Sequence, residues 1–255
     1  MNVTLRVQDD EHVHVVIQCC AHPEVLRILR LAQDLPQQRT PEWFAQRNNM
    51  ITASEVAAVL GVSKFQSRNV ALRNKVGAIL GSDQIGSKFC DNFITKWGNT
   101  HEDMVRDRFC TEYNEVAHEV GCIPHATIPM LGASPDGVLE SGALVEIKCP
   151  YKRVIDPNVV PLQYWHQMQL QMEVCNLNLC YYVEWAPAMD FFDPTKDIFS
   201  VQKVHRDAGW LSDNWKCIQS FWEDVQYYVN NPELAIQDLA SRKRRKLEKA
   251  AIEFV

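Results

Sequence analysis

Two short motifs constrain the fold of this chain more than any other feature: Ser-Pro-Asp-Gly at residues 134–137 and Glu-Ile-Lys at residues 146–148. The apolar residues between them flank a Ser-Gly pair at 141–142, and glycine tolerates the positive φ that tight turns often need. This pattern predicts a β-hairpin that folds Asp136 back towards Glu146. Because alternate residues of a strand face the same side, Glu146 and Lys148 share one face. The hairpin therefore brings two carboxylates and one ammonium group to the end of a small sheet.

Two carboxylates held this close repel each other, so one of them tends to stay protonated unless a cation lies between them. Mg²⁺ and Mn²⁺ prefer oxygen ligands, and Mg²⁺ usually takes only one or two carboxylates and keeps waters for the rest. Lys148 has no oxygen to offer a metal, but it can hold or deprotonate an attacking water, or neutralise the charge of a phosphate. Metal-assisted hydrolysis of a phosphodiester needs these groups. The alternative interpretation is an ordinary exposed hairpin that carries mixed charges.

The composition is that of a globular protein. With 255 residues, of which 46% are hydrophobic and 23% charged, the chain is long enough for one large domain or two small ones. No apolar run approaches the ~20 residues of a membrane span, and the N-terminus lacks the apolar core of a signal peptide. The nine cysteines include no Cys-x-x-Cys pair. They therefore predict reduced thiols in an intracellular protein, cytoplasmic or nuclear and not secreted.

The net charge and the spacing of the histidines bear on two possible ligands, nucleic acid and zinc. The net charge of −6 does not exclude nucleic-acid binding, because DNA affinity depends on local Lys and Arg, and an acidic metal cluster adds negative charge elsewhere. No His-Glu-x-x-His motif occurs among the eight histidines, so a zinc site is unsupported.

The N-terminal half predicts a hairpin over residues 1–18, a helix after His22-Pro23, and a helix capped by Thr40 with proline at its first position. A capping-box pattern then starts a short helix over about residues 53–60. Its first turn carries Thr52 and Ser54, with Arg47 just upstream. Free N–H groups and an arginine fork suit a phosphate. A plain capped helix beside a surface arginine is the alternative, because capping boxes are common.

The middle of the chain predicts an amphipathic helix over residues 67–80, with Arg68, Arg73 and Lys75 on its polar side. The Trp-Gly-Asn-Thr run at 97–100 predicts a break, after which a new helix begins. Glu102 would lie in the first turn of that helix, where it favours the helix dipole. A further carboxylate near the metals is the other interpretation of Glu102, and the local sequence does not choose between them.

The C-terminal half predicts a proline-containing loop over residues 150–161, in which Lys152 and Arg153 lie close to the presumed site. A glutamine-rich helix over 163–172 follows, and its amides either face solvent or position the water or the phosphate. Strands over 179–185 and 197–204 and a long helix over 207–229 come next. The basic run at 242–246 is either a nucleic-acid or nuclear-address segment or a solvated helix end.

The spacing D-x(9)-E-x-K resembles the PD-(D/E)xK nuclease motif. Taken with the Trp-x(3)-Arg run at 43–47, Ile-Thr-Ala-Ser-Glu at 51–55, Trp-Gly-x(3)-Glu at 97–102 and Tyr-x(2)-Gln-x-Gln at 164–169, it resembles the lambda-exonuclease-like, YqaJ-type viral recombinase family over about residues 39–185. The resemblance implies an α/β (α+β) fold with a restriction-endonuclease-like core, in which helices flank a central mixed β-sheet. It suggests a nuclease domain over 39–230, an accessory hairpin and helix over 1–38, and a basic tail over 231–255.

The same resemblance implies a Mg²⁺- or Mn²⁺-dependent 5′→3′ exonuclease that acts on double-stranded DNA ends and leaves 3′ overhangs for annealing recombination. Two ions would serve the site. Partners would be a single-strand annealing protein and two further copies of the chain in a ring-shaped trimer. No membrane partner is implied.

Site roles follow from the resemblance residue by residue. The metal ligands are Asp136, Glu146 and the Ile147 carbonyl, with Glu102 as the outer acidic residue. Lys148 resembles the lysine that activates the water, and Gln167 the glutamine that closes the motif series. Arg47 and Ser54 resemble a pocket for the 5′-phosphate. The neighbouring residues added to this DNA-binding set are Thr52, Lys152 and Arg153.

Two other functions stay open. A structure-specific endonuclease, or a DNA and RNA nuclease like the herpesvirus alkaline nuclease, would use the same site but would also cut a closed circular duplex. A DNA-binding module with a decayed site would leave linear duplex untouched with either metal, although the intact Asp136, Glu146 and Lys148 argue against it.

Overall fold

The computed structural model describes the backbone of residues 2–9 and 12–18, and residues 21–86, 93–151, 153–188 and 197–240 with their side chains apart from those of 94 and 95. Lys152 and the basic run at 242–246, both singled out from the sequence, lie outside the described residues. No helix in the described ranges is long and apolar enough to span a membrane. The six cysteines that the structure describes are all free thiols.

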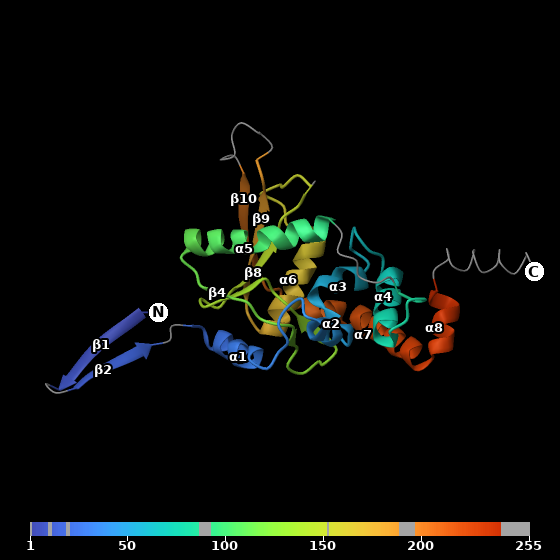
Figure 1. Ribbon diagram of the computed structural model, residues 1–255, viewed down its shortest axis with the longest axis horizontal. Helices are drawn as coiled ribbons and strands as arrows, with labels where there is room; N and C mark the ends of the chain where they lie inside the picture. The colour runs from blue at the N-terminus through green and yellow to red at the C-terminus, as the bar shows by residue number, and fades with distance from the viewer. Residues whose placement is uncertain are drawn as a thin grey trace, which may run out of the picture.

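A mixed five-stranded sheet forms the centre of the fold (Figure 1). Its strands lie in the order β10 (Ile198–His205), β9 (Leu179–Ala186), β8 (Leu144–Lys148), β7 (Gly137–Leu139) and β4 (Ala117–His118). β8 and β9 pair in parallel, and the other neighbours pair antiparallel. The mixed sheet confirms the predicted fold class. The strands predicted over 179–185 and 197–204 correspond to β9 and β10, which pair antiparallel.

Two small sheets accompany it. β3 (Ile51–Thr52) pairs in parallel with β6 (Leu131–Ala133), which pairs antiparallel with β5 (Ile123–Pro124). The predicted N-terminal hairpin is confirmed as β1 (Asn2–Asp9) and β2 (His12–Gln18), which pair antiparallel. The β3–β6 pairing matters for function, because it joins the segment around Thr52 to the strand that leads into the Ser-Pro-Asp-Gly motif.

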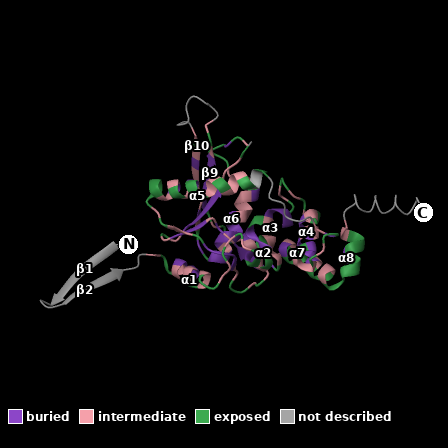
Figure 2. Ribbon diagram, viewed as in Figure 1, coloured by how far each residue is buried: buried purple, intermediate pink, exposed green. Residues whose placement is uncertain are grey.

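Helices cover both faces of the central sheet. On one face, Val105 and Phe109 of α5 (Phe93–Tyr113) pack against Val145 and Ile147. On the other, the apolar residues of α6 (Leu162–Cys175) pack in one cluster with Leu144. The two faces of β8 therefore meet different helices, as its alternating side chains require. Figure 2 shows the buried residues concentrated in this central region.

The remaining helices complete the main core. They are α1 (Pro23–Ala32), α2 (Pro41–Asn48), α3 (Ala53–Val59), α4 (Arg68–Leu80), α7 (Trp210–Asn230) and α8 (Pro232–Leu239). Each start that the sequence predicted for α1, α2, α3 and α4 lies within one residue of the observed one. Val25 and Ile28 of α1 and Ala235 of α8 belong to the same buried cluster as α3 and α6.

The central hairpin forms as predicted. β7 and β8 pair antiparallel with Gly137 opposite Val145, and Gly142 adopts φ +95° in the turn. A Cβ at Gly142 would come within 2.7 Å of the His22 ring, so both the positive φ and the close approach require glycine there. The turn fixes the register that places Asp136 beside β8.

The predicted helix break at residues 97–100 is wrong. α5 runs without interruption from Phe93 to Tyr113. The Thr100 hydroxyl donates back to the Lys96 carbonyl at 2.8 Å instead of capping a new helix. Gly98 lowers the local helix propensity by about 1 kcal/mol, but the packing of Val105 and Phe109 against the sheet outweighs this local preference. Glu102 therefore lies within a long helix and not in a first turn.

Candidate active site

The hairpin holds the Asp136 carboxylate directly against β8. The Ile147 backbone N–H donates to Asp136 Oδ2 at 2.7 Å, and Arg106 donates to the Asp136 carbonyl at 3.1 Å. The Asp136 carboxylate is thus held by a main-chain donor, and its main-chain carbonyl by an arginine side chain. These contacts bring Asp136 to the end of the strand that carries Glu146 and Lys148, as the sequence predicted.

Glu146 is a fully buried carboxylate with several donors. Gln167 Nε2 donates to its Oε1 and Gln171 Nε2 to its Oε2, both at 2.6 Å. Lys148 also donates to Oε1. The two amide donors come from one turn of α6, which packs on the face of β8 that Glu146 shares with Lys148. The polar face of α6 therefore points into the site, and Gln167 lies where the sequence predicted.

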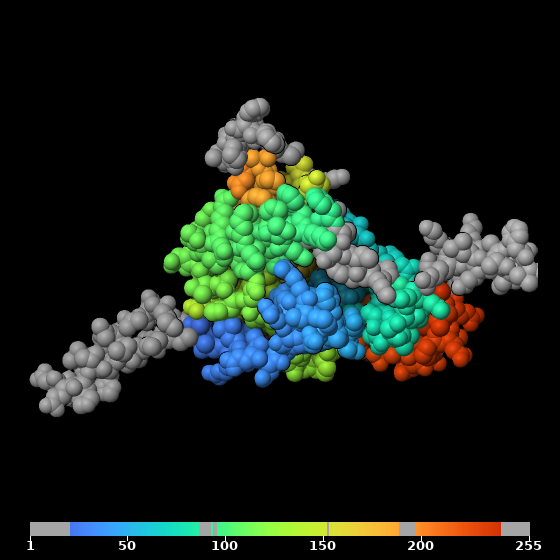
Figure 3. Space-filling view, viewed as in Figure 1, coloured from blue at the N-terminus to red at the C-terminus, as the bar shows by residue number. Residues whose placement is uncertain are grey.

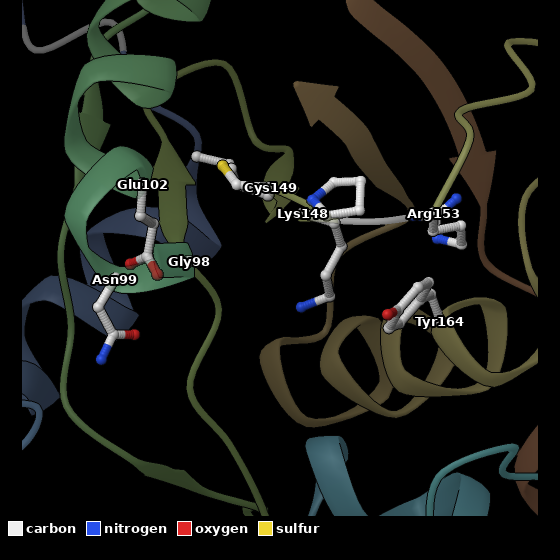
Figure 4. A pocket seen from close by; sticks show the side chains of 9 residues that line it. Gly98, Asn99, Glu102, Lys148, Cys149, Arg153 and Tyr164 are labelled. Atoms are coloured by element: carbon white, nitrogen blue, oxygen red, sulfur yellow. The ribbon is translucent and has the colours of Figure 1, made fainter. Parts of the chain in front are cut away.

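A pocket of about 250 Å³ opens beside Lys148. Figure 4 shows Glu102 and Asn99 on α5, across the pocket from Lys148, Arg153 and Tyr164. The other lining residues are Gly98, Ile147, Cys149 and Pro150. The pocket lies where β8 ends between α5 and α6, so it combines a carboxylate on one wall with two cations and an aromatic ring on the other.

The carboxylates interact electrostatically. Burial and the nearby charges of Glu146 and Glu102 raise the pKa of Asp136 well above its usual range. Burial also raises the pKa of Glu102, although Arg39 and Lys148 act in the opposite direction. Burial alone would lower the pKa of Lys148, but the Glu146 and Asp136 carboxylates raise it. Lys148 is therefore an ammonium group among competing negative charges.

A second buried carboxylate holds Arg153 at the pocket wall. Glu184, fully buried on β9, is paired with Lys148 in the strand register. It accepts from Arg153 and, at 2.8 Å, from the Tyr182 hydroxyl. Lys148 Nζ lies 5.2 Å and the Arg153 guanidinium 5.8 Å from the centre of the Tyr164 ring. This arrangement fixes the second cation of the pocket close to the first.

Arg47 lies at the centre of a separate polar cluster. Its guanidinium donates to Ser134 Oγ at 3.1 Å, Ser54 Oγ at 2.9 Å and Thr52 Oγ1 at 3.4 Å. It also stacks 4.1 Å from the centre of the Trp43 ring. The structure therefore brings together the three residues that the sequence predicted for phosphate binding and adds Ser134.

A model of the YqaJ-like viral recombinase domain matches residues 42–178, which are 137 of the 255 residues. The chain belongs to the YqaJ-like viral recombinase domain family. The lambda-exonuclease-like resemblance of the sequence motifs is thereby confirmed.

Two viral proteins are similar to this member of the family. Protein R354 of Acanthamoeba polyphaga mimivirus is 26% identical over 188 residues, which cover 66% of this chain and 33% of R354. Protein D345L of African swine fever virus strain Badajoz 1971 is 30% identical over 172 residues, which cover 55% of this chain and 47% of D345L. The chain thus spans a third to a half of these relatives.

The fold is also similar to that of a bacterial exonuclease of known structure. LHK-Exo, an alkaline exonuclease from Laribacter hongkongensis that was crystallised with dAMP, aligns with a TM-score of 0.65 and 29% identity over 79% of this chain and 100% of its own. The chain therefore shares the fold of this exonuclease. Together with the family membership, this similarity indicates that the chain is a nuclease.

The oxygen atoms gathered at this site are of the type that a hard divalent cation prefers as ligands. Asp136, Glu146 and Glu102 repel one another, and the Ile147 carbonyl lies on the same strand end. In the described part of the chain, however, no group of three or more His, Cys, Asp or Glu side chains is spaced to hold a metal. Both Glu146 oxygens accept from amide donors. A cation would have to share Glu146 with Gln167, Gln171 and Lys148.

The structure places further residues in the site to which the sequence analysis gave no role. Gln171 binds Glu146 from one turn beyond Gln167, and this spacing of four residues on a helix could have revealed it. Ser134 precedes Asp136 in the same motif but was not assigned to the Arg47 cluster. Glu184 carried no local signal, because its role arises from the β8–β9 pairing. Tyr164 belongs to the motif at 164–169 but was given no role in the site, because its approach to Lys148 and Arg153 arises from the packing of α6.

Lys75 was predicted to lie on the polar face of α4, but it is buried. Its side chain is 5% exposed, and its ammonium donates to the carbonyls of Arg47 and Met50 at 3.0 and 2.8 Å and to Glu55 at 2.9 Å. Burial raises the pKa of Glu55, but Lys75 and the Thr52 N–H outweigh it, so the net shift is downward. The amphipathic pattern misplaced Lys75 because an ion pair allows a charged side chain to be buried.

We expect Lys75→Met to destabilise the domain by about 3 kcal/mol, because it leaves two carbonyls and a carboxylate without a donor. A domain of this size would then lose roughly 6–12 °C in Tm, measured by differential scanning calorimetry. The control is Lys216→Met, which replaces an exposed lysine on α7 and should leave Tm unchanged. Equal Tm values for the two variants would show that the buried ammonium contributes nothing.

Proposed function

We propose that this domain is a divalent-cation-dependent 5′→3′ exonuclease that digests one strand of double-stranded DNA from its end and leaves a 3′ overhang. One observation supports this most strongly. Ser134, which accepts from Arg47 at 3.1 Å, lies only two residues before Asp136. Two residues span at most about 7 Å of chain. A phosphate bound by Arg47 would therefore lie next to the hydrolytic site, as removal of nucleotides from a 5′ end requires.

The roles within the site follow from its contacts. A divalent cation held by Asp136, Glu146 and the Ile147 carbonyl would supply Lewis-acid chemistry, and two ions are expected from the family resemblance. Lys148 would hold the attacking water or neutralise phosphate charge with its ammonium group. Gln167 keeps Glu146 in place, and Glu102 adds negative charge on the opposite wall.

The pocket also accounts for nucleotide binding. Lys148 and Arg153 offer two cations, and Tyr164 offers an aromatic face between them. Phosphates prefer such cations, and bases stack on aromatic rings. LHK-Exo was crystallised with dAMP, which supports a mononucleotide as the species that this pocket accepts. Arg153 is thereby proposed to contact DNA.

Arg47→Ala should lower kcat/KM on 5′-phosphorylated duplex by roughly 10- to 100-fold, because charge-assisted bonds to phosphate contribute about 1.5–3 kcal/mol. Duplex with 5′-hydroxyl ends should be affected much less. The measurement is initial rates on the two substrates side by side. Arg27→Gln, on α1, is the control. An equal loss on both substrates would refute the phosphate-binding assignment.

Linear and covalently closed circular duplexes of the same sequence test the proposed reaction. The exonuclease digests only the linear form. Cutting of the circle would instead favour a structure-specific endonuclease, and binding without cleavage in Mg²⁺ and Mn²⁺ would favour a DNA-binding module. The ring-shaped trimer and the annealing partner stay predictions, and the mass of the protein in solution tests the first.

A further inference from the structure

Arg39 adopts a backbone conformation that few residues other than glycine tolerate. Its φ is +68°, in a turn that the Thr40 N–H closes on the Gln37 carbonyl at 3.3 Å. Residues with φ above zero at this turn position are usually Gly or Asn. The left-handed conformation costs other residues roughly 1–2 kcal/mol. A side chain as large as arginine is therefore unexpected here.

The turn is fixed from both sides. The Gln38 amide donates to the carbonyls of Val120 at 2.7 Å and Pro135 at 3.3 Å. On the other side, Thr40 caps α2 and accepts from the Trp43 N–H at 3.3 Å. Pro135 is the residue before Asp136, so these bonds attach the turn to the catalytic hairpin and place Arg39 beside it.

The Arg39 side chain extends to the wall of the pocket. Its guanidinium donates to Glu102 Oε1 at 2.9 Å, while its own side chain stays 45% exposed. Figure 3 shows the segment around residues 33–48, in blue, meeting α5, in green, at the surface. Exposed ion pairs contribute about 0.2–1 kcal/mol. This is no more than the cost of the backbone conformation, so the ion pair alone does not account for an arginine at this position.

We propose that Arg39 binds a phosphate of the DNA backbone on the α5 side of the pocket, opposite Lys148 and Arg153. A guanidinium presents five N–H donors in a fork, and Glu102 is bonded to one nitrogen. The exposed remainder of the group faces solvent, where a phosphate oxygen can reach it. Glu102 is then the residue that positions Arg39. The proposal rests on the proposed nuclease function and adds a phosphate contact to it.

Because Arg39 has a positive φ, substitutions at this position can remove its charge without destabilising the fold. Arg39→Gly removes the guanidinium and also relieves the left-handed strain, so Tm should stay equal or rise while DNA binding falls. Arg39→Asn tolerates the same φ without the charge, and Arg39→Lys keeps the charge without the fork. Arg27→Gln is the matched control, because Arg27 is 41% exposed and pairs with Glu24 at 2.6 Å on α1.

Binding of a 5′-phosphorylated duplex is measured by fluorescence anisotropy in EDTA across a salt series, and KM is measured with Mg²⁺. We expect Arg39→Gly and Arg39→Asn to raise both Kd and KM roughly 5- to 10-fold. The slope of log K against log salt should become shallower by about 0.9, the value for one lost phosphate contact. Arg39→Lys should keep most of the slope, and Arg27→Gln should match the wild type.

Wild-type Kd, KM and salt slope in Arg39→Gly would overturn the assignment of Arg39 and leave the nuclease proposal intact. A fall in Tm together with weaker binding in Arg39→Gly would overturn it as well, because it would show a structural role. A wild-type protein that neither binds nor cuts duplex DNA would refute the proposed function itself, and the Arg39 assignment with it.

Discussion

Asp136→Asn should abolish cleavage of duplex DNA, lowering kcat/KM by at least roughly 10³-fold. Asparagine keeps the shape of the side chain and an oxygen that can accept from the Ile147 N–H. What it removes is the charge that would bind the cation, and a metal contributes several kcal/mol of charge stabilisation in the transition state. Initial rates on linear duplex with Mg²⁺ measure the effect.

The stability of this variant should move in the opposite direction. Burial, Glu146 and Glu102 raise the pKa of Asp136, and an aspartate whose pKa is raised on folding destabilises the folded state above its unfolded pKa. At neutral pH, the neutral asparagine should therefore leave Tm equal or higher. Asp213→Asn, which removes an exposed carboxylate on α7, is the control and should stay active. An active or unfolded Asp136→Asn would contradict the role given to Asp136.

Lys148→Met should lower kcat by roughly 10²- to 10³-fold, the range for loss of a group that stabilises charge in the transition state. Methionine keeps most of the aliphatic stem, so the packing against Tyr164 should persist. Glu146 keeps its bonds from Gln167 and Gln171, so the fold should survive. Single-turnover rates at saturating duplex separate this loss from weaker binding.

Lys203→Met is the matched control for Lys148→Met. Lys203 lies on β10, with its ammonium 5.7 Å from the centre of the Tyr181 ring, and so offers the same change of charge beside a tyrosine outside the pocket. Its kcat should equal that of the wild type. If Lys148→Met kept more than about a tenth of wild-type kcat, the lysine would be only a structural partner of Glu146.

The parts of the site that the sequence predicted are those governed by short-range rules. The period of two in β8 placed Glu146 and Lys148 on one face, and Gly142 marked the turn that returns the chain to Asp136. The Thr40 cap and the start of α3 were predicted for the same reason. Each of these features depends on residues fewer than about ten positions apart, where backbone geometry leaves few choices.

The features that the sequence did not predict depend on contacts between distant segments. Arg39 meets Glu102 across 63 positions and Lys64 meets Gln163 across 99, and no local pattern encodes such pairs. α5 continues through Gly98 because packing outweighs propensity. Lys75 is buried because Glu55 and two carbonyls, supplied by other elements, receive its ammonium group. Tertiary contacts decided each of these cases.

Linear duplex labelled at the 5′ end or at the 3′ end of one strand, incubated with Mg²⁺ and separately with EDTA, tests the central claim most directly. We predict that the 5′ label is released first as mononucleotide, that the 3′ label stays in long single strands, and that EDTA stops both. Release of the 3′ label first, internal cuts without end dependence, or equal cleavage in EDTA would contradict the proposed 5′→3′ metal-dependent exonuclease.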